Sequence, residues 1–111
     1  MTVRDFKLDF SALDWTVAAP GARYKAFERE ARRVRLVEFT REFVEPDWCC
    51  KGHVGQVLEG ELEIDFDGTV QHYAAGDGVF IPAGESSKHR HKRSITPRVL
   101  LFLVEDIQAA R

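Results

Sequence analysis

HVGQVLEGELEIDFDG, residues 53–68, decides the fold class of this chain of 111 residues. A tight turn is predicted at Glu59-Gly60, because glycine readily adopts the positive φ that such turns need. Beyond this turn apolar and acidic side chains alternate, which gives a strand one buried and one exposed face. The apolar residues are Leu62, Ile64 and Phe66, and the acidic ones are Glu61, Glu63 and Asp65. Asp67-Gly68 predicts the next turn, so the stretch indicates a β-hairpin.

Short apolar runs separated by turns continue on both sides of this hairpin. Downstream come TVQHYA, a turn at Gly76-Asp77, the run VFI with Val79 and Ile81 expected in the core, and a turn at Pro82–Gly84. Further strands are expected near residues 87–91 and 98–105, and upstream in RVRLVEF. FEREARR, residues 27–33, is interpreted as a charged turn or hairpin end. Roughly eight short strands predict an all-β sandwich or closed barrel.

The composition describes an ordinary globular chain, 44% hydrophobic and 31% charged, with a net charge of −2. We expect one domain over residues 1–111. The charge predicts no broad attraction to nucleic acid or to an anionic membrane. There is no glycine-rich phosphate loop and no local signature of a nucleophilic triad.

Cys49 and Cys50 are adjacent, so a disulfide between them would be strained. The first twenty residues hold five charged side chains and no apolar signal core. The longest apolar run, residues 99–104, is too short to span a bilayer. Reduced thiols in a cytoplasmic protein are therefore expected.

Two stretches, HVGQVLEGELEIDFDG and GDGVFIPAG (residues 76–84), resemble the motifs of the cupin superfamily. The first motif is usually written G, five residues, HxH, three or four residues, E, six residues, G. The second is G, five residues, PxG, two residues, H, three residues, N. Gly60 matches the end of the first, and Gly76 with Pro82-Ala83-Gly84 matches the opening of the second. The resemblance covers roughly residues 33–105. It implies a double-stranded β-helix, a jelly-roll barrel that typically holds a metal on three histidines and a glutamate.

The usual metal-ligand positions of the resemblance are occupied by other residues here. His53 stands at the glutamate position, with Cys49 and Asp47 at the histidine positions of the first motif. Ser87 stands at the histidine position of the second motif and His91 at its asparagine position. The resemblance therefore implies the fold without the standard metal centre.

Strand parity nevertheless predicts a pocket. In SSKHRHKR the cations alternate with Ser87, His89 and His91, so both histidines should face the barrel interior. Cys49 and His53 can share a site only if the chain turns at Lys51-Gly52, because four extended residues span ~13 Å. The predicted ligand pocket consists of Trp48, Cys49, His53, Ser87 and His89. The candidate metal ligands are His53, His89, Cys49 and His91, a set suited to zinc, iron, nickel or copper.

Two functions remain open from the sequence. One is a cupin that binds a small molecule of unknown identity in a divergent His/Cys pocket. The alternative is a metal-dependent cupin enzyme, an oxygenase, isomerase or lyase acting on a small polar substrate. Structural roles stay open as well, since His53 could bond a backbone carbonyl and Cys49 could be a small core residue. His72 is expected to be exposed, and a homodimer paired through its sheets is a further expectation.

Overall fold

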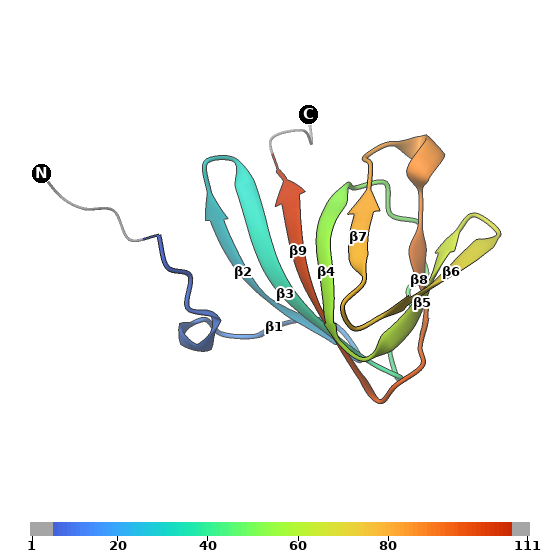
Figure 1. Ribbon diagram of the computed structural model, residues 1–111, viewed down its shortest axis with the longest axis horizontal. Helices are drawn as coiled ribbons and strands as arrows, with labels where there is room; N and C mark the ends of the chain where they lie inside the picture. Colours follow the sequence, from blue (N-terminus) through green and yellow to red (C-terminus); the bar gives the residue numbers. More distant parts are fainter. Residues whose placement is uncertain (1–5, 108–111) are drawn as a thin grey trace, which may run out of the picture.

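The computed structural model describes residues 6–107 and contains, over that range, strands and two short 3₁₀ turns but no α-helix. This confirms the all-β prediction (Figure 1). The strands are β1 (Thr16–Ala19), β2 (Ala22–Arg29), β3 (Arg32–Thr40), β4 (His53–Glu59), β5 (Glu61–Phe66), β6 (Thr69–Ala74), β7 (Gly78–Ile81), β8 (Arg90–Ser94) and β9 (Arg98–Asp106). The 3₁₀ turns are η1 (Phe10–Ala12) and η2 (Glu85–Ser87).

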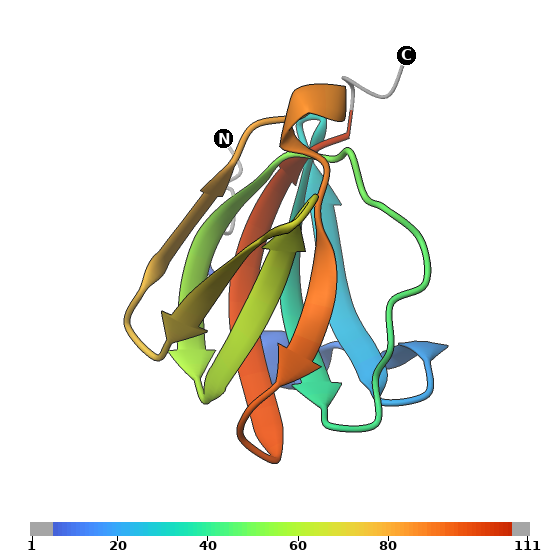
Figure 2. The same cartoon turned by 90° about the vertical axis from the view of Figure 1, so that its right-hand side faces the viewer.

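Two antiparallel sheets form the layers of a jelly-roll. The larger has the strand order β1-β2-β3-β9-β4-β7 and the smaller the order β6-β5-β8. The sheets come together at one end and diverge at the other (Figure 1). Residues 41–52 run along one side of the molecule from the end of β3 to the start of β4 (Figure 2). Apolar side chains from both layers fill the core between them: Val37, Val57, Leu62, Ile64, Val79, Ile81, Val99, Leu101 and Leu103.

The predicted inner face is largely confirmed. Leu62, Ile64, Val79 and Ile81 are buried, and Phe66 packs against the core while keeping partial exposure. The expectation that Asp65 is exposed was wrong, because this residue is only 9% exposed. Its carboxylate accepts a hydrogen bond from the main-chain N of Gly68 at 2.8 Å. Where β5 pairs with β8 the register shifts between Glu63 and Ile64, and the residue left unpaired is Lys92 of β8.

The predicted turns lie between strands as expected. Gly60 separates β4 from β5 with φ of 84°, a conformation that favours glycine. The interpretation of residues 27–33 as a charged turn was too broad. β2 continues to Arg29, and the turn consists of Glu30 and Ala31, both with positive φ. Pairing of Phe27 with Val34 extends the hairpin through this charged stretch. The segment before Gly21, which has little pattern in sequence, supplies η1 and β1.

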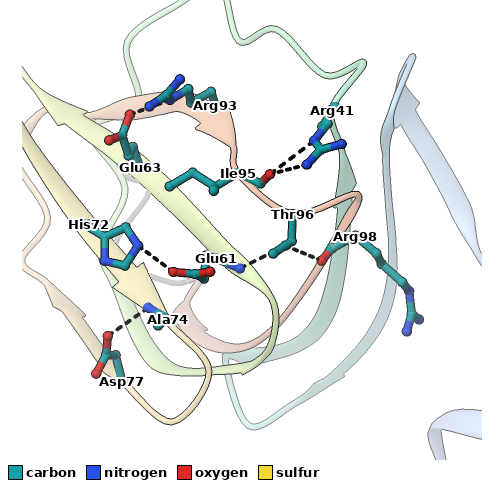
Figure 3. A network of polar contacts seen from close by, with 10 residues as sticks. All are labelled: Arg41, Glu61, Glu63, His72, Ala74, Asp77, Arg93, Ile95, Thr96 and Arg98. Atoms are coloured by element: carbon teal, nitrogen blue, oxygen red, sulfur yellow. Dashed lines mark hydrogen bonds and ion pairs between the residues drawn. The ribbon is translucent and has the colours of Figure 1, made fainter.

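The outer face of the smaller sheet carries polar pairs (Figure 3). His72 lies 3.0 Å from Glu61, and Arg93 donates to Glu63 at 2.8 Å. His72 is exposed, as expected. These are solvated surface contacts of a kind that contributes little to stability. Within residues 6–107 no helix has the length and apolar character needed to cross a bilayer.

Candidate functional site

Three sequence-predicted residues meet where the two sheets diverge. His53 opens β4, His89 directly precedes β8, and Cys49 lies in the segment that leads to β4. A two-way backbone bridge joins Cys49 to His89, with N–O distances of 2.7 Å and 3.0 Å. This bridge holds the segment before β4 against the smaller sheet, so the larger sheet and the smaller sheet both supply the site.

Gly52 allows the segment with Cys49 to lie close to His53, although its own backbone is not left-handed. Its φ is not in the positive range. A Cβ atom placed there would lie 3.0 Å from the main-chain N of Ala83 and 3.1 Å from the carbonyl of Ile81. A side chain at this position would crowd the backbone at the end of β7, so glycine lets residues 49–53 lie close against the sheet.

The ligand atoms of Cys49, His53 and His89 lie within 4.8 Å of one another. The Sγ of Cys49 is 3.7 Å from the Nε2 of His53. The two imidazole rings are 5.1 Å apart between centroids and nearly perpendicular, at 80°. Three soft or borderline donors thus face one point.

The far side of the His53 ring contacts a buried carboxylate. Its Nδ1 lies 2.6 Å from Oε2 of Glu105, an ion-pair distance, although the angle is poor for a hydrogen bond. Arg35 donates two hydrogen bonds to the same carboxylate, at 2.9 Å and 2.5 Å. The residues come from β3, β9 and β4, which are neighbours in the larger sheet. The chain Arg35–Glu105–His53 therefore orients the imidazole so that its Nε2 faces Cys49.

His89 is oriented in a similar way. Its Nδ1 lies 3.0 Å from the carbonyl oxygen of Ser87, which can only accept a hydrogen bond. The proton of a neutral His89 is therefore on Nδ1, and Nε2 is left as the basic nitrogen. In both histidines an acceptor at Nδ1 selects the form that presents Nε2 as a ligand.

The pKa values of three ionisable groups in the site are shifted by their neighbours. Hydrogen bonds with His53 and then His89 lower the pKa of the Cys49 thiol to about 6. Burial disfavours the charged form of His53, but its contacts with Cys49 and Glu105 outweigh this and raise its pKa to about 9. Burial likewise opposes ionisation of Glu105, yet His53 and Arg35 hold the pKa of its carboxyl at about 2. Without a metal, Cys49 and His53 therefore form a thiolate–imidazolium pair at neutral pH.

A cavity of about 270 Å³ lies between the sheets and includes Cys49, His53 and His89 in its wall. Its interior is mainly apolar. The apolar residues that line it include Val37, Leu62, Ile64, Val79, Ile81, Leu101 and Leu103. The site is therefore a polar cluster beside an apolar chamber, an arrangement typical of small-molecule sites.

Trp48 and Ser87, which were predicted to line this pocket, are not among the residues that surround the cavity. The guanidinium of Arg90 lies 4.3 Å from the Trp48 ring, and Lys88 also lies over that ring. Trp48 thus packs with the outward-facing cations of its neighbouring segment. Ser87 belongs to η2 and contributes its main-chain carbonyl to His89.

His91 lines the cavity but does not belong to the Cys49–His53–His89 group. Its ring lies against Phe39 and Phe43, with centroid distances of 4.6 Å and 5.1 Å. Burial lowers the pKa of His91 to about 4, so the ring is neutral at physiological pH. Parity places His89 and His91 on one face, but two residues of strand separate them by about 6.6 Å.

Comparison with known proteins identifies the architecture. No family model matches the chain, and no curated protein matches its sequence. Its structure is similar to KdgF from Halomonas sp., with TM-score 0.73, 20% identity and 94% of each chain covered. It is also similar to an RmlC-like cupin from Shewanella frigidimarina NCIMB 400, with TM-score 0.71, 17% identity, and 92% of this chain and 90% of that one covered. The chain has the cupin fold. A cupin-2 domain containing protein from the same Shewanella strain is a third neighbour, at TM-score 0.62 and 23% identity over 87% of each chain.

The donor set of this chain fits a divalent transition metal. In a tetrahedral zinc site, bonds of about 2.3 Å to sulfur and 2.0–2.1 Å to nitrogen place the donor atoms about 3.4–3.6 Å apart. The 3.7 Å between Sγ of Cys49 and Nε2 of His53 is close to this spacing, and donor atoms separated by up to 4.8 Å would have to approach one another by about 1 Å. A thiolate with two imidazoles suits zinc, copper, nickel or iron.

Glu105 and Arg35 are site residues that the sequence interpretation missed. The sequence does contain an indication of both residues, because each is a charged residue at an inward-facing position of an otherwise apolar strand. Glu105 shares the inward face of β9 with Val99, Leu101 and Leu103, and Arg35 shares that of β3 with Val37. A charged residue on an apolar face requires a partner, which here is supplied by the neighbouring strand.

Proposed function

We propose that this cupin binds a small molecule in the cavity between its sheets, beside a divalent metal ion held by Cys49, His53 and His89. The convergence of these three side chains carries the proposal. They approach from two sheets, and an acceptor behind each imidazole presents Nε2 to the thiol. Metal-binding histidines commonly have such an acceptor at the other ring nitrogen.

A bound divalent ion would supply Lewis-acid chemistry to an oxygen or nitrogen of the ligand. The chain's own groups supply orientation and exclusion of water. Glu105 and the carbonyl of Ser87 hold the two imidazoles, while the apolar wall of the cavity takes the body of the ligand. A buried, apolar chamber strengthens electrostatic interactions with any polar group that enters it.

The test is metal content and metal binding in protein produced without a histidine tag. We expect Co²⁺ to bind with one ion per chain and to give the intense near-ultraviolet absorption of a thiolate ligand. His53→Ala should abolish this binding, whereas His72→Ala should leave it unchanged because His72 lies on the outer face of the smaller sheet. Equal Co²⁺ affinity in wild type and His53→Ala would overturn the proposed metal centre.

A metal-dependent enzyme, such as an oxygenase, isomerase or lyase on a small polar substrate, is the second candidate. It is supported by the number of protein ligands. Three ligands leave a coordination position for substrate, as catalytic zinc sites do, whereas structural sites have four. Metal-loaded protein should then turn over a small metabolite, with the activity lost in both Cys49→Ala and His53→Ala. Binding without turnover across a broad metabolite panel would favour the binding protein.

We further propose a homodimer through the outer face of the larger sheet, in a cytoplasmic setting that keeps both thiols reduced. Phe80 is 77% exposed and its cross-strand partner Val54 is 47% exposed. Contiguous apolar patches on a surface mark interaction sites, and these two side chains are neighbours across β4 and β7. Light scattering should give twice the chain mass for wild type and the monomer mass for Phe80→Asp. A monomeric wild type would exclude this dimer.

A further inference from the structure

Arg35 is a cation on the inner face of the larger sheet, beside the cavity. It lies two residues before the core residue Val37 on β3, so both side chains are on the same face of the strand. Its cross-strand partner on β9 is Leu103, which also lines the cavity. The guanidinium lies 5.4 Å from the ring of Tyr24, a third residue of this wall. The Arg35 side chain keeps 20% of its surface exposed, so part of it is accessible from the cavity.

One edge of this guanidinium is occupied and the other is not. Nε and Nη2 donate to the two carboxylate oxygens of Glu105, at 2.9 Å and 2.5 Å. Glu105 does not line the cavity, whereas Arg35 does. Nη1 lies on the edge of the planar group that faces away from this carboxylate, and no hydrogen bond from it is found among residues 6–107. Arg35 therefore has two N–H donors left for a group that enters the cavity.

Two further cations border the cavity. Lys51 is exposed, and none of the ion pairs found among residues 6–107 includes it. Arg23 is bound to Glu38, which follows Val37 on β3 and so lies on the outer face of the sheet. The guanidinium of Arg23 is therefore directed away from the cavity, and the cations that face it are Arg35 and Lys51.

The anionic groups around the cavity leave this side of it positive. Cys49 and His53 together carry no net charge, whether the proton that they share is on the sulfur or on the nitrogen. Glu45 is the carboxylate among the lining residues, and it is held against β8 of the smaller sheet, where the main-chain N of His91 donates to it at 2.6 Å. An ionised group that leaves water needs a counter-charge and hydrogen bonds, and an anion finds both at Arg35.

We infer that the cavity binds a small organic carboxylate, one oxygen of which accepts hydrogen bonds from Nη1 of Arg35. Arginine and carboxylate form short, charge-assisted hydrogen bonds. The rest of the ligand is apolar, because the walls near Arg35 consist of side chains such as Leu62, Leu101 and Leu103. The cavity volume of about 270 Å³ is at the lower end for small-molecule pockets, so the ligand is small. This inference rests on the proposed function, because it specifies the molecule that the proposed cavity binds.

Benzoate and benzamide provide a matched pair of probes, since they have nearly the same size and shape and differ in charge. In NMR titrations of protein without added metal, wild type should bind benzoate about tenfold or more tightly than benzamide. In Arg35→Gln the two affinities should lie within about threefold of each other, whereas a purely structural role of Arg35 would weaken both probes alike and keep the preference. Arg93→Gln, which removes an exposed arginine on the outer face of the smaller sheet (Figure 3), is the control and should keep the wild-type preference.

A measurement on wild type tests the inference even if Arg35→Gln does not fold. The ring protons of bound benzoate should give nuclear Overhauser contacts to the methyl groups of Leu103, the cross-strand neighbour of Arg35. Contacts confined to Val54 and Phe80 would place the probe on the outer face and overturn the inference. Equal affinities of wild type for the two probes would also overturn it, as would the wild-type preference in a folded Arg35→Gln.

Co²⁺ binding, measured on separate portions of the protein without benzoate, distinguishes this inference from the proposed metal centre. If benzoate is preferred as expected and Co²⁺ does not bind, the metal centre is wrong and the inference stands. If Co²⁺ binds and wild type does not prefer benzoate, the inference alone is wrong.

Discussion

His53 has two functional edges, one toward Cys49 and one toward Glu105. The contact with Cys49 could be predicted from the sequence. Strand parity and the possible turn at Lys51-Gly52 put Cys49 and His53 in one pocket with His89. Parity could not reveal the second edge without a model of strand order, since Glu105 is distant in sequence and reaches His53 only because β9 pairs with β4. Parity also could not predict that His91 lies apart from the other donors. It predicts which face of a strand a side chain is on, but not its distance from other side chains.

Glu105→Gln should weaken Co²⁺ affinity about 10–100-fold, because it removes the carboxylate that orients His53. The change keeps the size of the side chain, so the effect reports orientation and charge. Competition with a colorimetric chelator measures it. Glu63→Gln, which breaks an exposed pair with Arg93, is the control and should retain wild-type affinity. Wild-type affinity in Glu105→Gln would contradict the role assigned to this carboxylate.

Metal affinity should rise with pH. Metal binding requires a neutral His53 and an ionised Cys49. The pKa of His53 is raised to about 9, so below that value a metal must displace one proton, and below the Cys49 pKa of about 6 it must displace another. We expect the Co²⁺ association constant to increase about tenfold per pH unit between about pH 6 and 8, to level off near pH 9, and to change more steeply below 6. A flat profile over pH 6–9 would contradict the thiolate–imidazolium pair.

At the scale of the elements, the hairpin β4–β5 and the turns after it were predictable because their information is local. Alternation sets the inner face, and Gly60 permits the turn. The missed elements depend on distant partners. β1 has no strong pattern of its own and exists through pairing with β2, while Phe27–Arg29 becomes strand because β3 pairs with it. Asp65 was misplaced because its carboxylate bonds to the main-chain N of Gly68 in the following turn, a contact that alternation does not reveal.

Glu38 joins three neighbouring strands of the larger sheet. It lies on β3 and accepts hydrogen bonds from Arg23 on β2 and Arg98 on β9. These bonds, led by that of Arg23, lower the pKa of Glu38 below its ordinary value of 4.5. Glu38→Gln should therefore lower the free energy of unfolding by about 1–3 kcal/mol at pH 7.

The same substitution carries a pH signature. Because the folded pKa of Glu38 is depressed, its stabilising effect is complete above pH 4.5 and is lost as the pH falls through the folded value. The stability difference between wild type and Glu38→Gln should be constant from about pH 6 to 8 and should shrink below 4.5. Urea unfolding across this range measures it, with Glu28→Gln at the exposed Arg33 pair as control. A difference that grows on acidification would contradict the assignment.

For the whole molecule, the two sheets depend on one shared apolar core. Ile64 lies in this core on β5 and is 8% exposed. Ile64→Ala should cost roughly 2–5 kcal/mol of unfolding free energy, through lost burial and the cavity left behind. Val70→Ala, on an exposed position of the neighbouring β6, should cost far less. Chemical denaturation compares the two variants. Equal losses would contradict the burial assigned to Ile64, and a larger loss in Val70→Ala would mean that the inner and outer faces of this sheet are exchanged.

The backbone bridge between Cys49 and His89 provides a way to detect metal binding by hydrogen exchange. Its two amide protons lie on the residues that offer the sulfur and one imidazole to the metal. A metal ion bound by both side chains would also stabilise the backbone bridge. Both amides should therefore exchange with deuterium far more slowly once the ion binds. The exchange rates of the Cys49 and His89 amides would therefore report whether the metal site is occupied. This readout needs no added label and does not depend on what the cavity holds.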